Sequence, residues 1–296
     1  MVEFDFIPPM LTAAKWNALL DHGLEKEADY VIRRTATRFE AIDGSTGKIF
    51  DSTSDLLDVG LLVNSCKDEL PTERIAKPRI ALKGAFPVKT KILLDDDYLI
   101  LDLRQAYLTL DADVDMIQIG TPSALQNQVE IWGGLLDGKK SVRSAGMLLN
   151  LYGSWCKILG TTFINGKQHG IQAAGKSGTY AWMNTIRDCY FSGITLGSIY
   201  VKNWVAYMPI LASYFDGLSA TVGTASGIAM EAPAGYSGGL WVKESFFYKF
   251  PAFGCLLRGS DNWVKDTYFW KIGMSGIKIA SDEDSWATYG LSLIHI

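Results

Sequence analysis

The strongest constraint on this chain is a six-residue phrase that recurs from about residue 129 onward. It consists of an aliphatic residue, two spacers, a small polar residue, one spacer and an aromatic residue. Copies occupy 158–163, 186–191, 210–215, 242–247 and 264–269, and a worn copy ends at Leu136. The final positions of successive copies are 27, 28, 24, 32 and 22 residues apart. Each cycle holds short strand-like runs and no helical periodicity, which predicts a solenoid whose turns cover one another's apolar faces.

A second phrase, a glycine followed by a mostly apolar run, recurs once per cycle after the first phrase. It begins at Gly146, Gly170, Gly197, Gly227, Gly254 and Gly276. In a coil of stacked turns, the first phrase predicts three ladders of equivalent side chains. These are an aliphatic ladder (Ile158, Ile186, Ile210, Val242, Val264), an aromatic ladder (Phe163, Phe191, Phe215, Phe247, Phe269) and a ladder of small residues (Thr161, Cys189, Ser213, Ser245, Thr267). We expect all three ladders to form the core.

Charge and hydropathy exclude several classes of function. The 296 residues carry a formal net charge of −4 and have a pI of about 5.5, so no basic field favours nucleic acid. No apolar stretch reaches the roughly 18 residues that span a bilayer, and no secretory signal peptide is visible. We expect no nucleic-acid binding, no membrane insertion, and location on a virion or extracellular surface if the protein is viral. A cytoplasmic location is the alternative.

The chain divides into four predicted segments. Residues 1–28 form a lead-in with a short helix, and residues 29–78 hold a β-hairpin and a capping helix. In the hairpin, Tyr30–Arg33 and Lys48–Phe50 flank a turn at 43–47, and the helix is capped by residues 52–55. Residues 79–290 form the coil. Residues 291–296 resemble the translation of a sequencing adapter, as in an environmental read.

The start of the coil resembles that of right-handed parallel β-helix proteins of the pectin-lyase type. The resemblance rests on a Gly-x-Phe-Pro-Val strand at 84–88, an Ile-Leu-Leu strand at 92–94, three aspartates at 95–97 and a Gly-Gly-Leu-Leu-Asp-Gly rung at 133–138. It covers roughly residues 50–290 and implies an all-β fold, a single-stranded right-handed parallel β-helix with an N-terminal hairpin and capping helix. It implies no single activity, because this superfamily hosts lyases, hydrolases, epimerases and adhesins.

Two positions of the repeated phrase are candidates for chemistry. The cations Arg187, Lys243 and Lys265 share one position, and the acids Asp188, Glu244 and Asp266 share the next. Stacked turn residues explain this pattern without function, because small acidic residues accept backbone N–H bonds and neighbouring cations offset their charge. Alternatively the acids are catalytic, since turns about 4.8 Å apart place consecutive carboxylates near the separation used by retaining glycosidases.

The motifs of pectin-lyase-type enzymes are matched only in part. Gln168-His169-Gly170 echoes a Gly-His-Gly motif of polygalacturonases, whereas Asn184-Thr185-Ile186 lacks the acid of their Asn-Thr-Asp motif. No acidic cluster suited to Ca²⁺ is visible, so we expect no metal and no cofactor. His169 is a candidate for substrate binding, with a structural role at a turn as the alternative. Trp182 and Trp270 are candidates for stacking on sugars.

Three functions remain open. The first is a carbohydrate-recognising β-helix, a viral tailspike or surface adhesin that binds a polysaccharide or cell-surface glycan, with a homotrimer as its implied assembly. Residues 11–17 resemble stretches near the start of some viral tail-fibre proteins. The second is a pectinase-like lyase or glycoside hydrolase that uses the three acids, while the three cations, the two tryptophans and His169 bind substrate. The third is a purely structural solenoid.

Overall fold

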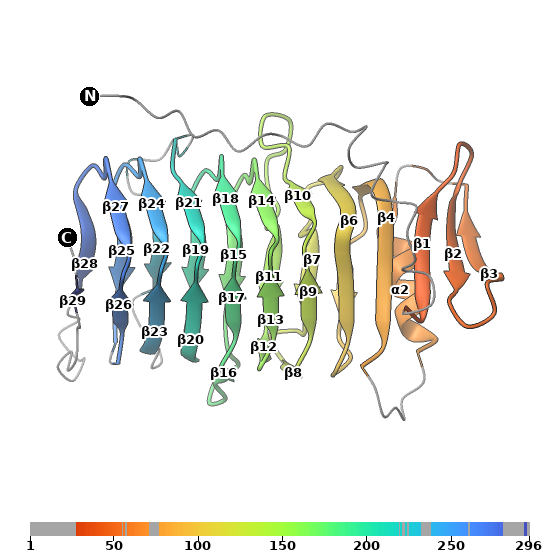
Figure 1. The fold of residues 1–296 in the computed structure, drawn as a ribbon, viewed down its shortest axis with the longest axis horizontal. Coiled ribbons are helices and arrows are strands. Elements are labelled where there is room, and N and C mark those ends of the chain that lie inside the picture. The colour runs from red at the N-terminus through yellow and green to blue at the C-terminus, as the bar shows by residue number, and fades with distance from the viewer. Residues whose placement is uncertain are drawn as a thin grey trace.

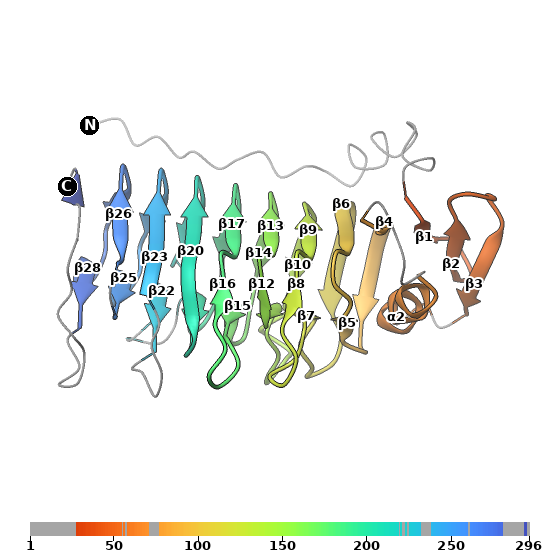
Figure 2. The same ribbon diagram turned by 90° about the horizontal axis from the view of Figure 1, so that it is seen from below.

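The described part of the chain is a parallel β-helix whose turns stack along one long axis (Figures 1 and 2). The computed structural model describes residues 28–280, apart from 55, 57, 71–76, 219, 221–222, 224, 232–237 and 260, together with 293–294. The predicted lead-in helix lies outside these residues. Within them, neighbouring strands of the coil pair in parallel, which confirms the all-β solenoid.

Each turn contributes strands to three faces. Strip 1 consists of β9 (Glu130–Trp132), β13 (Lys157–Leu159), β17 (Thr185–Arg187), β20 (Val205–Leu211), β23 (Gly238–Lys243), β26 (Trp263–Lys265) and β29 (Leu293–Ile294). Strip 2 consists of β10 (Leu135–Asp137), β14 (Thr162–Ile164), β18 (Tyr190–Ser192), β21 (Tyr214–Asp216), β24 (Phe246–Tyr248) and β27 (Tyr268–Trp270). The long strands β4 (Arg79–Val88) and β6 (Ile100–Leu110) pair with each other, and β6 pairs with both β9 and β10, so the strips share their first turns.

The third face is a separate eight-stranded sheet. It consists of β5 (Ile92–Leu94), β7 (Ile117–Ile119), β11 (Leu149–Leu151), β15 (His169–Ala173), β19 (Gly197–Val201), β22 (Ser226–Met230), β25 (Phe253–Leu257) and β28 (Ser275–Ile279). Short strands lead from this sheet back to strip 1, namely β8 (Gln126–Asn127), β12 (Gly153–Ser154) and β16 (Ala181–Trp182).

The three predicted ladders are confirmed. Ile158 pairs in register with Ile186, and the column continues through Ile210 and Val242 to Val264. The five phenylalanines stack with ring centroids 4.8, 4.9, 4.4 and 5.0 Å apart along the axis. Each turn places the same kind of side chain against its equivalent in the next turn. The ladders therefore fill the core in layers, each about as thick as the spacing between neighbouring strands.

The glycine phrase is confirmed as the eight-stranded sheet, with two errors of register. Leu149 pairs with Ile171, so the equivalent of Gly170 in the preceding turn is Leu148 and not Gly146. Gly197 pairs with His169 and Ser226, so the equivalent of the other glycines in that turn is Ser198. At the glycines in register, which are Gly170, Gly227, Gly254 and Gly276, the missing side chain makes room for the aromatic ladder. A Cβ on Gly227, for example, would lie 2.5 Å from Cδ1 of Phe247. Gly197 instead has a φ of 134°, a backbone conformation that side chains disfavour.

The N-terminal hairpin prediction omitted one strand. The predicted turn at 43–47 joins β2 (Phe39–Asp43) to β3 (Ile49–Thr53), and β1 (Tyr30–Arg34) pairs antiparallel with β2 on its other side. β1 also pairs in parallel with β4. The three-stranded meander therefore extends strip 1 beyond the first turn of the coil, on the right in Figure 1.

The capping helix is present but begins later than predicted. Residues 52 and 53 end β3, and α2 spans Gly60–Asp68. Asp58 accepts hydrogen bonds from the backbone of Gly60, Lys89 and Thr90 at 3.0–3.1 Å. From the helix, the Asn64 amide donates to the carbonyl of Lys91 at 3.0 Å and accepts from the N–H of Leu93 at 2.9 Å. α2 thus provides hydrogen-bond partners for backbone groups at the edge strand β5, as a cap of an open sheet must.

Candidate functional site

The predicted acids lie at the bend between strip 1 and strip 2. Asp188, Glu244 and Asp266 have φ angles of 54°, 53° and 49°, and Gly160 and Ala212 share this left-handed conformation in the same column. The N–H of Asp188 donates to the carbonyl of Leu211 at 3.1 Å, and that of Glu244 to Lys265 at 3.2 Å. The column is therefore a turn, as predicted. Backbone hydrogen bonds between turns hold the bend. The prediction that the three carboxylates accept hydrogen bonds from backbone N–H groups is not met among the described residues.

Two of the three acids, Asp188 and Glu244, form ion pairs with the neighbouring cations. Nε of Arg187 lies 3.2 Å from Oδ2 of Asp188, and Nζ of Lys243 lies 2.7 Å from Oε1 of Glu244. All four side chains are exposed. The hydrogen bond from Lys243 lowers the pKa of the Glu244 carboxyl, whereas a general acid in a glycosidase needs a raised pKa. At these two turns the column thus presents ion pairs to solvent.

Trp182, on β16, is the first of a row of aromatic rings that continues along the outer surface of strip 1. We call this set the aromatic row: Trp182, Tyr207, Trp241 and Trp263. Successive ring centroids are 5.5, 5.7 and 6.0 Å apart, with interplanar angles of 20°, 63° and 34°. Trp182 is 40% exposed and Trp263 54%. The rings of Trp182 and Tyr207 are stacked, whereas the Tyr207–Trp241 and Trp241–Trp263 pairs are inclined and leave part of each ring face open, unlike the stacked core phenylalanines.

Strip 2 also carries outward aromatic side chains, but most of them stack closely. Tyr190, Tyr214 and Phe246 stack at 5.3 and 5.1 Å with interplanar angles of 14° and 12°, so their edges rather than their faces meet solvent. Trp270 lies at the far end of this strip and is 57% exposed, with Nζ of Lys271 6.0 Å from its ring. Trp270 is therefore across the bend from the aromatic row.

His169 lies apart from the other candidates, on the eight-stranded sheet. Its ring stacks 4.6 Å from that of Tyr200, and Nδ1 lies 3.2 Å from the carbonyl oxygen of Gly197. Burial lowers the pKa of the His169 imidazole to about 4. The ring is neutral near pH 7 and is held by structural contacts, so it joins no group with the acids of the bend.

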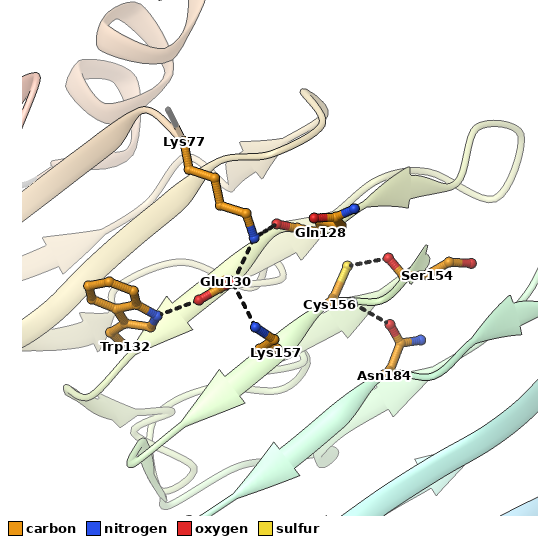
Figure 3. Close-up of polar contacts among 8 residues, drawn as sticks. All are labelled: Lys77, Gln128, Glu130, Trp132, Ser154, Cys156, Lys157 and Asn184. Atoms are coloured by element: carbon orange, nitrogen blue, oxygen red, sulfur yellow. Dashed lines mark hydrogen bonds and ion pairs between the residues drawn. The ribbon is translucent and has the colours of Figure 1, made fainter. Parts of the chain in front are cut away.

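A polar cluster at the N-terminal end of strip 1 had no counterpart among the sequence predictions (Figure 3). The Glu130 carboxylate accepts hydrogen bonds from Lys77 at 2.6 Å, Trp132 at 2.8 Å and Lys157 at 3.1 Å. Burial opposes its ionisation, but these three donors outweigh that effect and lower the pKa of Glu130. Glu130 is consequently a buried carboxylate that orients two ammonium groups.

A second buried carboxylate lies one turn earlier, where Asp102 pairs in register with Trp132. Asp102 accepts hydrogen bonds from the guanidinium groups of Arg79 at 2.9 Å and Arg104 at 2.8–3.0 Å. The Arg79 and Arg104 guanidinium carbons lie 5.5 and 5.3 Å from the Trp132 ring. Trp132 thus joins the two carboxylate centres into one unit.

Neither a metal site nor a membrane span emerges from the described residues. No group of three histidine, cysteine or acidic side chains there could hold a metal ion, and no helix there is long and apolar enough to cross a bilayer. The four cysteines, Cys66, Cys156, Cys189 and Cys255, are buried and free. Asn184 is fully buried and bonds to the backbone of Cys156 and Gly153, so it supports a bend of the coil.

Comparisons with known proteins identify no family for this chain. No protein-family model matches it, and no curated protein matches it. Among solved structures, it is similar to the A-module of the mannuronan C-5 epimerase AlgE4 from Azotobacter vinelandii. That similarity covers 72% of this chain and 91% of the A-module at 9% identity, with a TM-score of 0.22. A similarity at this level carries no inference about activity, and the assignment of the chain as a parallel β-helix rests on its own strand pairing.

Proposed function

We propose that this protein is a carbohydrate-binding β-helix, a viral tailspike or surface adhesin, whose aromatic row binds a polysaccharide. The observation that carries the proposal is the row itself: one ring on β16 and three on the strip 1 strands β20, β23 and β26, with the two end rings, Trp182 and Trp263, 40% and 54% exposed. Large exposed aromatic side chains gathered on one face of a protein mark an interaction surface. Trp155, which is 53% exposed, lies next to Trp182, to whose carbonyl its backbone N–H donates.

The repeat of the coil suits a repeating ligand. Successive strands are about 4.8 Å apart, which is close to the length of one sugar unit in a chain. A glycan that lies along the axis therefore meets an equivalent position of the coil at nearly every sugar. Tryptophan and tyrosine rings contribute a flat apolar face together with a polar edge, the combination that matches a sugar ring with its apolar face and peripheral hydroxyl groups.

Catalysis by Asp188, Glu244 and Asp266 is the alternative. It is supported by their placement in one column, with Glu244 and Asp266 on consecutive turns. It is weakened by the ion pair of Glu244 with Lys243, which lowers the carboxyl pKa. A retaining hydrolase in this column would use Glu244 in its ionised form and Asp266 as the acid. Binding without cleavage is the function that the contacts favour.

A glycan-binding screen tests the proposal. The full chain is applied to a panel of neutral and acidic polysaccharides, and hits are measured by calorimetry. Trp182→Ala and Trp263→Ala should each weaken binding about tenfold or more, because a ring that stacks on a ligand contributes on the order of 1.5 kcal/mol. Tyr268→Ala is the matched control, since this ring is 69% exposed but lies on strip 2.

Two results would count against the proposal. Equal loss of affinity in Tyr268→Ala and Trp263→Ala would remove the aromatic row as the binding surface, and no binding to any glycan would favour a purely structural solenoid. Release of reducing or unsaturated sugar that depends on Glu244 would instead support the enzyme alternative. The tailspike assignment predicts a homotrimer by sedimentation, so a stable monomer would limit the proposal to a monomeric adhesin.

A further inference from the structure

Only two of the three predicted cation–acid pairs at the bend are formed in the described part of the chain. At the turns of β17 and β23, the cation contacts the acid that follows it. At the turn of β26, the side chains of Lys265 and Asp266 form no hydrogen bond or ion pair with a described residue. Lys265 is exposed and Asp266 is half-buried. Their hydrogen-bonding groups are therefore available to another molecule.

Trp263 lies beside these two residues, on the same strand. In β26, Val264 is buried while Trp263 and Lys265 are exposed, so the indole ring and the ammonium group extend from one outward face. Residues two apart on a strand are separated by roughly 6.6 Å, and Asp266 follows directly at the bend. A ring, a donor and an acceptor thus lie within reach of a single sugar unit.

The ring of Trp263 is also open to a ligand. It is 54% exposed, and its one ring contact among the described residues is with Trp241, 6.0 Å away at an interplanar angle of 34°. Its indole N–H has no acceptor in the described chain. The ring therefore offers a partly open apolar face together with a free N–H donor.

The charges of this group favour a neutral ligand. An ammonium group only donates hydrogen bonds and a carboxylate only accepts them, whereas a hydroxyl group does both. A charged sugar is attracted by one of Lys265 and Asp266 and repelled by the other. Adjacent hydroxyl groups of a neutral sugar can accept from Lys265 and donate to Asp266 while the apolar face of the sugar lies on Trp263. The preceding turn adds no net charge, because its lysine and glutamate form an ion pair.

We propose that Trp263, Lys265 and Asp266 form one subsite of the glycan-binding surface, and that this subsite takes a neutral sugar unit with adjacent free hydroxyl groups. This inference rests on the proposed function for the nature of the ligand. It narrows the polysaccharide to one whose repeat contains an uncharged sugar. It also assigns the binding of that sugar to the end of the aromatic row at β26, where the ring, the donor and the acceptor are all available.

Monosaccharide probes test the subsite on the full chain. The methyl glycosides of D-glucose, D-mannose and D-galactose are neutral and differ only in the orientation of hydroxyl groups. The methyl glycosides of D-glucuronic acid and D-glucosamine are their anionic and cationic counterparts. Binding is measured by ligand-observed NMR titration, and we expect at least one neutral glycoside to bind more tightly than both charged ones. The neutral glycoside that binds best identifies the arrangement of hydroxyl groups that is recognised.

Two substitutions that copy another turn of the coil assign this binding to the subsite. Leu211 occupies the column of Lys265, and Ala212 has the left-handed conformation of Asp266 in the next column. Lys265→Leu and Asp266→Ala should therefore fold, which thermal melting checks. Each should weaken binding of the preferred neutral glycoside roughly tenfold or more, since a hydrogen bond to a charged group is lost. Lys48→Gln, in the exposed β2–β3 turn, should bind as the unchanged protein does.

The outcomes separate this inference from the proposed function. The subsite is refuted if no neutral glycoside binds, if a charged one binds as tightly, or if either Lys265→Leu or Asp266→Ala binds normally. These results refute it even when the glycan panel gives hits that depend on Trp182 and Trp263. If a neutral glycoside binds through Lys265 and Asp266 while the panel gives no hit, the subsite stands and the polysaccharide proposal fails. Panel hits that weaken in both variants and not in Lys48→Gln support both.

Discussion

Replacement of Phe215 with alanine tests whether the aromatic ladder holds the turns of the coil together. The Phe215 side chain is fully buried, and its ring stacks 4.9 Å from that of Phe191 and 4.4 Å from that of Phe247. Truncation of a buried phenylalanine costs about 3–5 kcal/mol through lost transfer free energy and a residual cavity. We expect the free energy of unfolding to fall by about 4–5 kcal/mol, because buried neighbours on both sides prevent the cavity from collapsing.

Phe215→Leu is the matched variant, because leucine already occupies the same column in earlier turns, at Leu108 and Leu136. It keeps most of the buried volume and loses two stacked contacts, so we expect a loss of about 1–3 kcal/mol. Urea unfolding is followed by circular dichroism and by tryptophan fluorescence, whose coincidence checks two-state behaviour in a repeat protein. A loss below about 1 kcal/mol for Phe215→Ala, or equal losses for both variants, would refute this explanation of the core.

Three further predictions concern the eight-stranded sheet and its cap. Because the pKa of folded His169 is about 4 and that of the unfolded chain is near 6.5, the protein should lose stability as the pH falls from about 6.5 toward 4. His169→Gln should remove the part of the pH dependence of stability that His169 causes. An NMR titration in which folded His169 shows a pKa near 6.5 would contradict this prediction. Asn64→Ala should cost about 2 kcal/mol in urea unfolding by leaving β5 unsatisfied, whereas Leu61→Ala, at a residue 56% exposed, should change stability by less than about 0.5 kcal/mol. Gly227→Ala should cost about 1–3 kcal/mol by overpacking, and adding Phe247→Leu should recover part of that loss in a double-mutant cycle.

The core could be predicted from the sequence because its chemistry repeats once per turn. Ile186 and Phe191 keep the same spacing in every copy of the phrase, so their columns follow from the period alone. The glycine phrase failed at Gly146 and Gly197, where glycines with positive φ angles stand two residues and one residue from the expected places. The predicted start of α2 was wrong because the polar residues 52 and 53 end strand β3 and do not cap a helix.

The polar cluster and the bends could not be predicted in the same way. Lys77 and Glu130 are 53 residues apart in the sequence and are brought together by the strand register of the first turns. The repeated phrase begins only at about residue 129, so it does not predict this register. The bends use residues as different as Trp155, Asp188 and Tyr207 in one left-handed conformation, so residue type gives no signature. The single available signal was alternation: Glu130 and Trp132 flank the buried Ile131, as Lys157 and Leu159 flank Ile158, which marks them as outward-facing neighbours.

Hydroxyl-radical footprinting of tryptophan side chains with the glycan identified on the panel tests the central claim most directly. The exposed rings of Trp182 and Trp263 belong to the aromatic row, whereas Trp270, which is 57% exposed, lies on strip 2 and is an internal reference in the same sample. We predict that bound glycan lowers the oxidation rates of Trp182 and Trp263 and leaves that of Trp270 unchanged. Protection of Trp270 with continued oxidation of Trp182 and Trp263 would contradict the assignment of the aromatic row as the binding surface.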